Sequence, residues 1–345
     1  MGIVSAQSEL RDHYQRPLTD LRISVTDRCN LRCTYCMPKK PNGERYNFLP
    51  KEDLLSFNEI TRVVNVLAQK GLQKIRITGG EPLLRKDLDQ LIASIKSIDG
   101  IKEVALTTNG VFLSEQIDAL VDAGLDRVTL SLDAIDQDLL NRISGRTVDL
   151  EKVYAGLDAT LQKDLKLKVN TVIQRGVNDD HFMHVLQRFR GTAVEVRLIE
   201  FMDVGGLNQW QLDKVVPSRE LIQKIEQKWP LEMLGRQQSS DVANRYRYAD
   251  GQGTLGFISS ISQPFCGHCS RARLSSEGIL YTCLFANTGL LIRDKLRDGL
   301  SDDELQELLT QHWQQRRDRY SEERMTKPGR AHAESEKIEM FYIGG

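Results

Sequence analysis

Two kinds of apolar spacing alternate along the first 201 residues. Short runs such as Lys74–Thr78 place apolar residues at every second position, and the longer stretches between them repeat apolar residues every three or four positions. The short runs predict strands and the longer stretches predict helices. The predicted strands are Leu21–Thr26, Lys74–Thr78, Glu103–Thr108, Arg127–Leu132, Lys166–Ile173 and Ala193–Phe201. The predicted helices are Lys51–Lys70, Lys86–Ile98, Ser114–Ala123 (with Ser114 as N-cap), Leu150–Lys163 and Asp179–Arg190.

This alternation predicts an α/β fold built from strand–helix units. Consecutive units of this kind form a parallel sheet with right-handed connections. The six predicted strands make an incomplete barrel of the (β/α)6 type, because a closed barrel of this kind needs about eight strands.

The alternation stops after residue 202, so we expect a smaller C-terminal domain of α+β type. It would hold a helix at Ser218–Lys228, strands at Tyr246–Tyr248 and Thr254–Ser260, and a late helix at Asp302–Gln315. The charged, poorly periodic stretch Arg316–Glu336 predicts a mobile segment. The expected regions are an N-terminal extension (residues 1–17), the partial barrel (18–216) and the C-terminal domain (217–345), which ends in a flexible Gly344–Gly345 tail.

Composition and charge reduce the number of function classes that the sequence allows. The chain has 345 residues, 40% of them hydrophobic, and its 47 basic residues are balanced by 48 acidic ones. A large core is therefore available, and bulk nucleic-acid binding, which needs excess positive charge, is disfavoured. No apolar run reaches the roughly 18 residues of a membrane span, and Met1–Asp20 has no apolar signal-peptide centre. We expect a cytoplasmic protein with no membrane partner.

The six cysteines form two groups of three. Cys29, Cys33 and Cys36 have C-x3-C-x2-C spacing, and a second group with C-x2-C-x13-C spacing consists of Cys266, Cys269 and Cys283. In a reducing cytosol such groups favour metal binding over disulfides. Thiolates suit both iron–sulfur clusters and zinc, and His268 could complete a zinc site in the second group. An iron–sulfur cluster held by three thiolates would leave one iron open for chemistry.

The carboxyl ends of the predicted strands are the expected place for ligands in a parallel α/β fold. The first strand leads into the first cysteine group, and the second leads into Gly79–Gly80. These glycines either let a ligand approach the backbone or form a tight turn. Arg22 shares a strand face with Ser24 and Thr26, and Arg76 shares one with Lys74 and Thr78. If those faces line the interior, Arg22 and Arg76 point with Lys168 into one cavity. The alternative is that these three side chains are outward, solvated charges.

The first cysteine group lies in ISVTDRCNLRCTYCMP, and ITGGEPLL follows one strand later. Both stretches, in this order, resemble the motifs of the radical S-adenosylmethionine (SAM) family. The resemblance implies that Cys29, Cys33 and Cys36 hold a [4Fe-4S] cluster whose open iron binds SAM, and that an electron from it splits SAM to give a 5'-deoxyadenosyl radical. It further implies that the residues that contact SAM are Tyr35, Gly80, Ser131 and Met202.

The second cysteine group lies in FCGHCSRARLSSEGILYTCLF, which has an R-x-R sequence just after Cys269. Together with the Gly-Gly terminus, it is similar to the branch of the radical SAM family that acts in molybdenum cofactor biosynthesis, over Leu18–Gly345. This resemblance implies a lyase that converts GTP to 3',8-cyclo-7,8-dihydro-GTP, with a second [4Fe-4S] cluster that binds the guanine base. The implied ligands of that cluster are Cys266, Cys269 and Cys283. The implied GTP contacts are Arg22, Arg76, Thr107, Lys168, Arg271, Ala272 and Arg273, of which Arg22, Arg271 and Arg273 also act in catalysis.

Two other functions remain compatible with the sequence. One is a radical SAM enzyme with a different substrate, such as a peptide, and the other is a non-enzymatic zinc protein that binds a nucleotide or a partner. For partners, the resemblance implies that pyranopterin monophosphate synthase takes the product, and a homodimer is compatible with the sequence. The electron donor and the role of His268 stay open.

Overall fold

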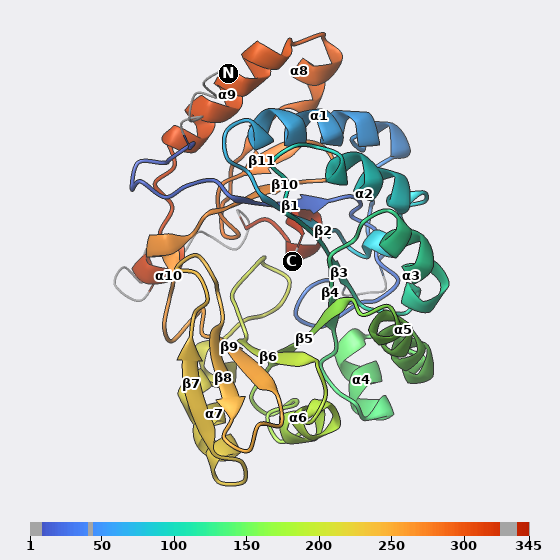
Figure 1. Ribbon diagram of the computed structural model, residues 1–345, viewed down its shortest axis with the longest axis vertical. Coiled ribbons are helices and arrows are strands. Elements are labelled where there is room, and N and C mark those ends of the chain that lie inside the picture. The colour runs from blue at the N-terminus through green and yellow to red at the C-terminus, as the bar shows by residue number, and fades with distance from the viewer. Residues whose placement is uncertain (1–8, 41–43, 325–336, 345) are drawn as a thin grey trace, which may run out of the picture.

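The computed structural model describes residues 9–40, 44–324 and 337–344. In these ranges the strands form one sheet in the order β12-β11-β10-β1-β2-β3-β4-β5-β6-β9-β8-β7. Its centre is a run of parallel strands in chain order, which are β1 (Asp20–Ser24), β2 (Lys74–Thr78), β3 (Glu103–Thr108), β4 (Arg127–Ser131), β5 (Lys166–Ile173) and β6 (Glu195–Glu200). The sheet curves without closing on itself (Figure 1), which confirms the predicted incomplete α/β barrel.

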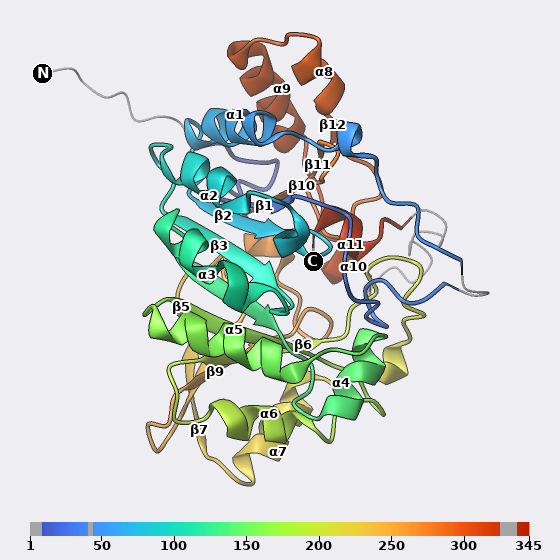
Figure 2. The same ribbon diagram turned by 90° about the vertical axis from the view of Figure 1, so that its right-hand side faces the viewer.

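Helices cover the convex face of this curved sheet, as Figures 1 and 2 show. They are α1 (Phe57–Ala68), α2 (Leu88–Lys96), α3 (Leu113–Asp122), α4 (Gln137–Ser144), α5 (Leu150–Gln162) and α6 (Phe182–Phe189). Alternation along each strand separates this face from the concave one. On β1, Leu21 and Ile23 are fully buried in the hydrophobic core under the helices, and Arg22 between them lines a cavity on the other side.

Local capping explains where the observed helices differ from the predicted ones. Ser56 and Glu59 form a reciprocal capping box, so α1 begins at Phe57 and not at Lys51. The prediction that Ser114 is an N-cap is wrong, because α3 begins one residue earlier. The sequence prediction missed α4, which Asp136 caps at its N-terminus.

The C-terminal part of the chain adds strands to both edges of the six-stranded centre. At one edge, β9 (Thr254–Ile258) pairs in parallel with β6 and continues antiparallel to β8 (Asn244–Tyr248) and β7 (Leu231–Gly235). At the other edge, β10 (Arg271–Leu274) pairs in parallel with β1 and continues to β11 (Ile279–Tyr281) and β12 (Leu290–Leu291). The C-terminal helices are α7 (Ser218–Glu226), α8 (Arg293–Arg297) and α9 (Asp302–Gln314). The C-terminal strands thus extend the barrel sheet itself, while the boundary at residue 216 stays a prediction.

Glu200, at the end of β6, ties these additions to the barrel. Its side chain is fully buried. It accepts hydrogen bonds from the backbone N–H groups of Ser218 (2.8 Å), Ile261 (2.9 Å) and Ser262 (2.8 Å). The hydroxyls of Ser218 (3.0 Å) and Ser262 (2.5 Å) donate to the same carboxylate. One buried charge therefore holds the start of α7 and the segment after β9 against the barrel.

The prediction of a mobile segment from Arg316 onward is wrong for residues 316–324. Arg316 is only 4% exposed, and Tyr320–Glu323 form the short helix α10. This stretch is ordered because its charged side chains bind backbone carbonyls and carboxylates of the folded core. Residues 325–336 lie outside the described residues. The chain then returns through α11 (Met340–Ile343) to the concave side of the sheet (Figure 1).

The described part of the chain contains no helix that is long and apolar enough to cross a membrane.

Candidate active site

The first cysteine group lies in the loop that follows β1, at the carboxyl ends of the parallel strands. All three thiols are free and half-buried. The backbone N–H of Leu31 donates to Cys29 Sγ (3.3 Å), and the backbone N–H of Cys36 donates to the carbonyl of Cys33 (3.0 Å). Burial raises the pKa of Cys29 to about 11, and it also raises the pKa values of Cys33 and Cys36 well above the ordinary value. The raised pKa values favour the neutral thiols, and a metal cluster would have to bind these cysteines as thiolates.

Gly79 and Gly80 pack directly against the start of this cysteine loop. The N–H of Gly80 donates to the carbonyl of Thr26 (2.7 Å), and the N–H of Glu81 donates to the carbonyl of Arg28 (2.8 Å). A Cβ on Gly80 would lie 2.3 Å from the Arg28 carbonyl oxygen. A glycine is therefore required here because two backbone segments of the protein come into contact. This packing reason is nearer to the tight-turn alternative than to the alternative that a ligand approaches the backbone.

Tyr35, within the cysteine loop, is held by a buried carboxylate. Its hydroxyl donates to Asp133 Oδ2 (2.7 Å), and Asp133 Oδ1 accepts from the N–H of Val172 (2.8 Å). Burial raises the pKa of Asp133 to about 6, against the opposing effect of the Tyr35 hydrogen bond. Ser131 ends β4 next to this pair, and Met202 follows β6. The four residues expected to contact SAM thus all follow or end strands at the carboxyl edge of the sheet; the expectation did not include Asp133.

The second cysteine group lies at the opposite ends of the strands from the first group. Cys266 and Cys269 precede β10, and Cys283 follows β11, which runs antiparallel to it. Cys266 begins a single 3-10 turn, η5 (Cys266–His268), which leads to Cys269. His268, in this turn, is exposed. Because β10 runs parallel to β1, this group lies at the amino ends of the barrel strands. The two cysteine groups therefore lie at opposite ends of the barrel strands.

Guanidinium groups make the second group electrostatically different from the first. Arg316 Nη2 (3.2 Å) and Arg271 Nη2 (3.3 Å) donate to Cys269 Sγ. Burial alone would raise the pKa of Cys269, but Arg271 and Arg316 outweigh it and lower the pKa to about 6. Burial and Asp318 raise the pKa of Cys283 to about 12. The two guanidiniums thus favour the thiolate form of Cys269, the form in which cysteine binds a metal.

Among the described residues, no three His, Cys, Asp or Glu side chains converge as a single metal ion requires. In a [4Fe-4S] cluster each thiolate binds a different iron, so three cysteine ligands need not converge on one point. The chemistry of the donors in both groups, three thiols each, fits such a cluster.

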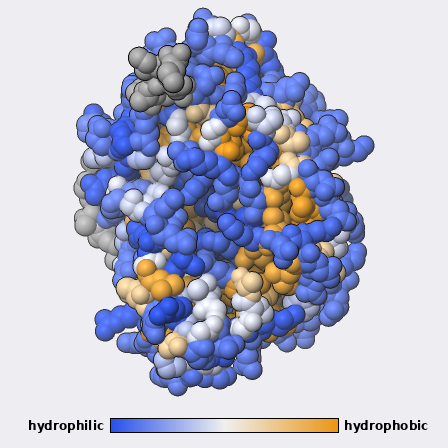
Figure 3. Space-filling model, viewed as in Figure 1, coloured by the Kyte–Doolittle hydropathy of each residue, from blue (hydrophilic) through white to orange (hydrophobic). Residues whose placement is uncertain are grey.

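A polar cavity of about 280 Å³ opens between the strands near the second cysteine group. Hydrophilic residues border the hollow at the centre of the view in Figure 3. The basic side chains that line the cavity are Arg22, Lys74, Arg76, Arg127, Lys168, Arg197 and Arg271. Its acidic lining residues are Asp20, Glu103 and Asp241. The prediction that Arg22, Arg76 and Lys168 face one cavity is confirmed, and the alternative of outward, solvated charges is wrong.

Three arginines form a row across neighbouring strands, which we call the arginine row: Arg273 on β10, Arg22 on β1 and Arg76 on β2. Arg22 is in register with Arg273 on one side and with Arg76 on the other. The Nε atoms of Arg22 and Arg76 are buried and have no hydrogen-bond partner in the described parts of the chain. Burial, followed by the charges of Arg273 and Arg271, lowers the pKa of Arg22 to about 9. Burial and then Arg22 lower the pKa of Arg76 well below its usual value.

Lys168 and Arg197 share one carboxylate instead. Glu195 lies 3.3 Å from Lys168 Nζ, 2.7 Å from Arg197 Nε and 2.8 Å from Arg245 Nε. Burial alone would raise the pKa of Glu195, but Arg197 and Lys168 in particular lower it to about 2. Burial lowers the pKa of Lys168 to about 8, with Arg197 acting in the same direction. This side of the cavity is therefore partly neutralised by ion pairs, whereas the arginine row forms no ion pair among the described residues and faces the more distant charge of Asp20.

The remaining candidates lie around the same interior. Thr107 Oγ1 on β3 is buried without a partner among the described residues, as is Asn170 Oδ1 on β5. Ala272 lies on the opposite face of β10 from Arg271 and Arg273, so only its backbone can reach the cavity. Arg273 is 5% exposed and donates to the carbonyl of Gly344, which places the end of α11 beside the arginine row. Gly345 lies outside the described residues.

Sequence reasoning missed several polar residues of this interior. Arg127, Arg197 and Asn170 were not among the expected site residues, and Lys74 was placed on the same strand face as Arg76 without a role in the site. The two-residue alternation that identified Arg22 also places Lys74 on the face of Arg76, Arg127 on the face of Ser131, Asn170 on the face of Lys168 and Arg197 on the face of Glu195. Their strand pattern was therefore sufficient to find them.

Two family models match the chain in succession. Residues 23–189 match the Radical SAM superfamily, and residues 194–322 match Molybdenum Cofactor Synthesis C. The GTP 3',8-cyclases of Staphylococcus aureus strains JH9 and Newman are each 46% identical to the chain over 338 residues, which cover 98% of this chain and 99% of theirs. The chain belongs to the GTP 3',8-cyclase family of radical SAM enzymes.

A solved structure confirms the fold of this GTP 3',8-cyclase family member independently. The crystal structure of Streptococcus suis SuiB bound to S-adenosylmethionine superposes with a TM-score of 0.57 at 16% identity, and the match covers 86% of this chain and 68% of that one. The resemblance inferred from the cysteine motifs is thereby confirmed at the level of family and fold. The roles of individual residues stay predictions.

Proposed function

We propose that this protein converts GTP to 3',8-cyclo-7,8-dihydro-GTP in molybdenum cofactor biosynthesis, at a site that spans the two cysteine groups. The arginine row carries the proposal. Three neighbouring guanidiniums, two of them with buried Nε atoms that have no partner in the described residues, are costly unless an anion binds between them. A triphosphate supplies several negative charges and matches the planar fork of arginine.

The triphosphate is proposed to lie near the amino ends of the strands. Arg22 and Arg76 would bind it first, because their Nε atoms compete with no carboxylate. Lys168 would have to leave Glu195 in part, since the two are 3.3 Å apart. The ribose would then lie along the barrel interior, where the Thr107 hydroxyl can donate or accept a hydrogen bond and Asn170 Oδ1 can accept one.

The first cysteine group would hold one [4Fe-4S] cluster, with SAM beside it. When bound, this pair supplies the electron and the radical that start the reaction. The chain's own contribution is to hold the loop in place: Gly80 packs against its backbone, and Asp133 fixes the ring of Tyr35. Ser131 and Met202 would complete the SAM contacts from the next strand ends.

The second group would hold another [4Fe-4S] cluster, which the guanine base approaches from the cavity. Arg271 would link the two, because it lines the cavity and donates to Cys269 Sγ (3.3 Å). Arg273 would position the substrate from the far end of the arginine row. We further propose a cytosolic enzyme whose product passes to pyranopterin monophosphate synthase.

An anaerobic turnover assay tests this function. The protein is reconstituted with iron and sulfide, its iron is counted, and SAM, a reductant and GTP are added. We expect about eight irons per chain, formation of 5'-deoxyadenosine that depends on GTP, and an isomer of GTP detected by mass spectrometry. SAM cleavage that is indifferent to GTP would point to another substrate, and zinc in place of iron with no cleavage would refute the enzyme.

A further inference from the structure

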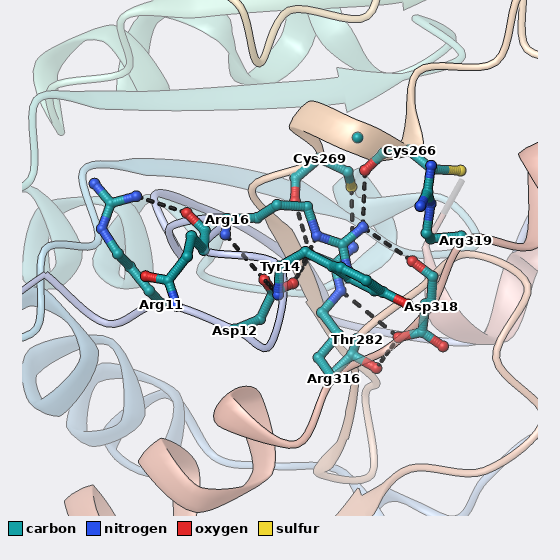
Figure 4. A network of polar contacts seen from close by, with 12 residues as sticks. Arg11, Asp12, Tyr14, Arg16, Cys266, Cys269, Thr282, Arg316, Asp318 and Arg319 are labelled. Atoms are coloured by element: carbon teal, nitrogen blue, oxygen red, sulfur yellow. Dashed lines mark hydrogen bonds and ion pairs between the residues drawn. The ribbon is translucent and has the colours of Figure 1, made fainter.

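Two buried arginines that do not line the cavity form hydrogen bonds with the loop that carries Cys266 and Cys269. Arg16 comes from the N-terminal hairpin, in which Arg11 and Pro17 form a β-bridge, and Arg316 follows the end of α9. They are 2% and 4% exposed. Figure 4 shows both guanidiniums beside the two cysteines, with Asp12 next to them.

Arg16 holds the loop by its backbone. Its Nη1 donates to the carbonyl of Cys266 (2.8 Å) and to the carbonyl of Asp318 (2.9 Å), and its Nε donates to Asp12 Oδ2 (2.6 Å). Arg16 has no contact with a cysteine sulfur among the contacts of the described residues. Its effect on the cysteine group is therefore geometric.

Arg316 holds the same loop by its backbone and by a sulfur. Its Nη1 donates to the carbonyl of Cys269 (2.7 Å), and its Nη2 donates to Cys269 Sγ (3.2 Å). Its guanidinium carbon lies 4.5 Å from the ring centroid of Trp313, which is fully buried and donates its Nε1 hydrogen to the carbonyl of Arg16 (3.3 Å). The fork of Arg316 is therefore fixed before any cluster binds.

Neither residue has a role in the proposed GTP contacts, so their burial needs another explanation. A buried arginine is costly, and Arg16 and Arg316 share one carboxylate, Asp12, at 2.6 and 3.5 Å. A second carboxylate, Asp318, lies 3.6 Å from Arg316 Nε, and the remaining donor of the Arg316 fork is directed at Cys269 Sγ. N–H groups that donate to a ligating sulfur withdraw electron density from it and favour the reduced state of an iron–sulfur cluster.

We propose that Arg316 is a positioning residue of the second cysteine group, which fixes the Cys269 thiolate for iron and raises the reduction potential of the cluster bound there. Arg16 orients the same loop through Cys266 without contact with sulfur. This inference rests on the proposed function, because it needs an iron–sulfur cluster on Cys266, Cys269 and Cys283. It assigns a task to residues outside the cavity and outside both cysteine motifs.

The test uses the full chain with Cys29, Cys33 and Cys36 replaced by alanine, so that only the second cluster contributes. In this parent, iron is counted, the midpoint potential is followed by electron paramagnetic resonance during a redox titration, and iron release to a chelator is timed. Arg316→Gln is expected to shift the midpoint to more negative potential and to release iron about tenfold faster or more. Arg16→Gln is expected to release iron faster with a smaller shift in potential.

Two further variants separate charge from geometry. Arg316→Lys keeps the charge but cannot reach the carbonyl and the sulfur together. Its midpoint potential is therefore expected to shift less from that of the parent than the potential of Arg316→Gln does, while it still loses iron faster than the parent. Arg247→Gln removes the same charge from an exposed ion pair between Arg247 on β8 and Glu232 on β7, strands at the other end of the sheet order from β10, and is expected to change neither value.

The outcomes distinguish the two proposals. A parent that binds no iron would refute the second cluster and with it the proposed function. A parent with about four irons, in which Arg316→Gln behaves like Arg247→Gln, would refute the role of Arg316 alone. If Arg316→Gln does not fold, Arg316→Lys provides the test instead. Iron release from Arg316→Lys at the same rate as from the parent would then overturn the inference.

Discussion

At the scale of single residues, the site is defined by charges that lack partners. Arg22 and Arg76 point into the cavity, and their Nε atoms have no partner among the described residues. Lys168 differs, because Glu195 lies 3.3 Å away. A buried positive charge therefore costs stability where no ion pair forms and is compensated where a carboxylate lies beside it, and the places without an ion pair indicate where an anion binds.

Replacing Arg76 separates binding from stability. In Arg76→Met we expect GTP to bind about 10 to 100 times more weakly, because a charge-assisted hydrogen bond to phosphate is worth roughly 1.5–3 kcal/mol. We also expect the free protein to become more stable by about 1 kcal/mol, because a poorly compensated charge leaves the interior. Calorimetric titration with GTP and urea unfolding measure the two effects. Arg247→Met, on an exposed ion pair, is the control, and a loss of stability in Arg76→Met would contradict the argument.

The pKa of Lys168 predicts how GTP affinity depends on pH. Burial and Arg197 lower this pKa to about 8 in the free protein, and a bound triphosphate would raise it. Binding therefore takes up a proton above pH 8, and affinity falls as pH rises from 7.5 to 8.5, where a terminal phosphate (pKa about 6) is already ionised. Lys168→Arg stays charged and should flatten this part of the profile. Calorimetry in buffers of different ionisation enthalpy counts the protons, and equal profiles in both proteins would exclude Lys168 as the cause.

At the scale of elements, the first site depends on contact between two strand-end loops. The loop after β2 lies so close to the cysteine loop that the N–H groups of Gly80 and Glu81 bond to the carbonyls of Thr26 (2.7 Å) and Arg28 (2.8 Å). This contact positions the segment directly before Cys29. It also explains why two glycines stand together at this strand end.

A single methyl group at this contact should damage the first cysteine site. In Gly80→Ala the added carbon would lie 2.3 Å from the backbone oxygen of Arg28, so the loops must move apart. We expect a loss of about 1–3 kcal/mol in the free energy of unfolding and reduced iron uptake at the first group. Urea unfolding and iron counts in a background with Cys266, Cys269 and Cys283 replaced by alanine measure both. In Gly267→Ala the added methyl meets nothing closer than 3.8 Å, so its stability should not change; full iron uptake in Gly80→Ala would disprove the role of the contact.

At the scale of the whole molecule, the sequence revealed the parts that depend on local spacing. The strand–helix alternation predicted the six central strands, and the alternation of Arg22 with Leu21 and Ile23 predicted which side chains enter the barrel. It could not reveal that Arg273 lies beside Arg22, because their strands are about 250 residues apart in the chain and their pairing depends on the return of the C-terminal strands. The low periodicity of residues 316–324 was misleading for the same reason, since their order comes from contacts with distant backbone.

Glu200 is the residue on which this long-range assembly can be tested. Its carboxylate accepts five hydrogen bonds from Ser218, Ile261 and Ser262. In Glu200→Gln an amide NH2 replaces one acceptor and faces N–H donors, so we expect a loss of roughly 2–3 kcal/mol in the free energy of unfolding. Glu232→Gln, at an exposed ion pair with Arg247, should cost less than about 1 kcal/mol. Because Glu200 joins the barrel to both α7 and the segment that leads to Cys266, the Glu200 variant should also become more sensitive to proteolysis after β9. Unfolding in urea followed by circular dichroism, together with mapping of the cleavage sites, tests this expectation, and a variant as stable and as protected as Glu232→Gln would show that the C-terminal strands are held by their pairing alone.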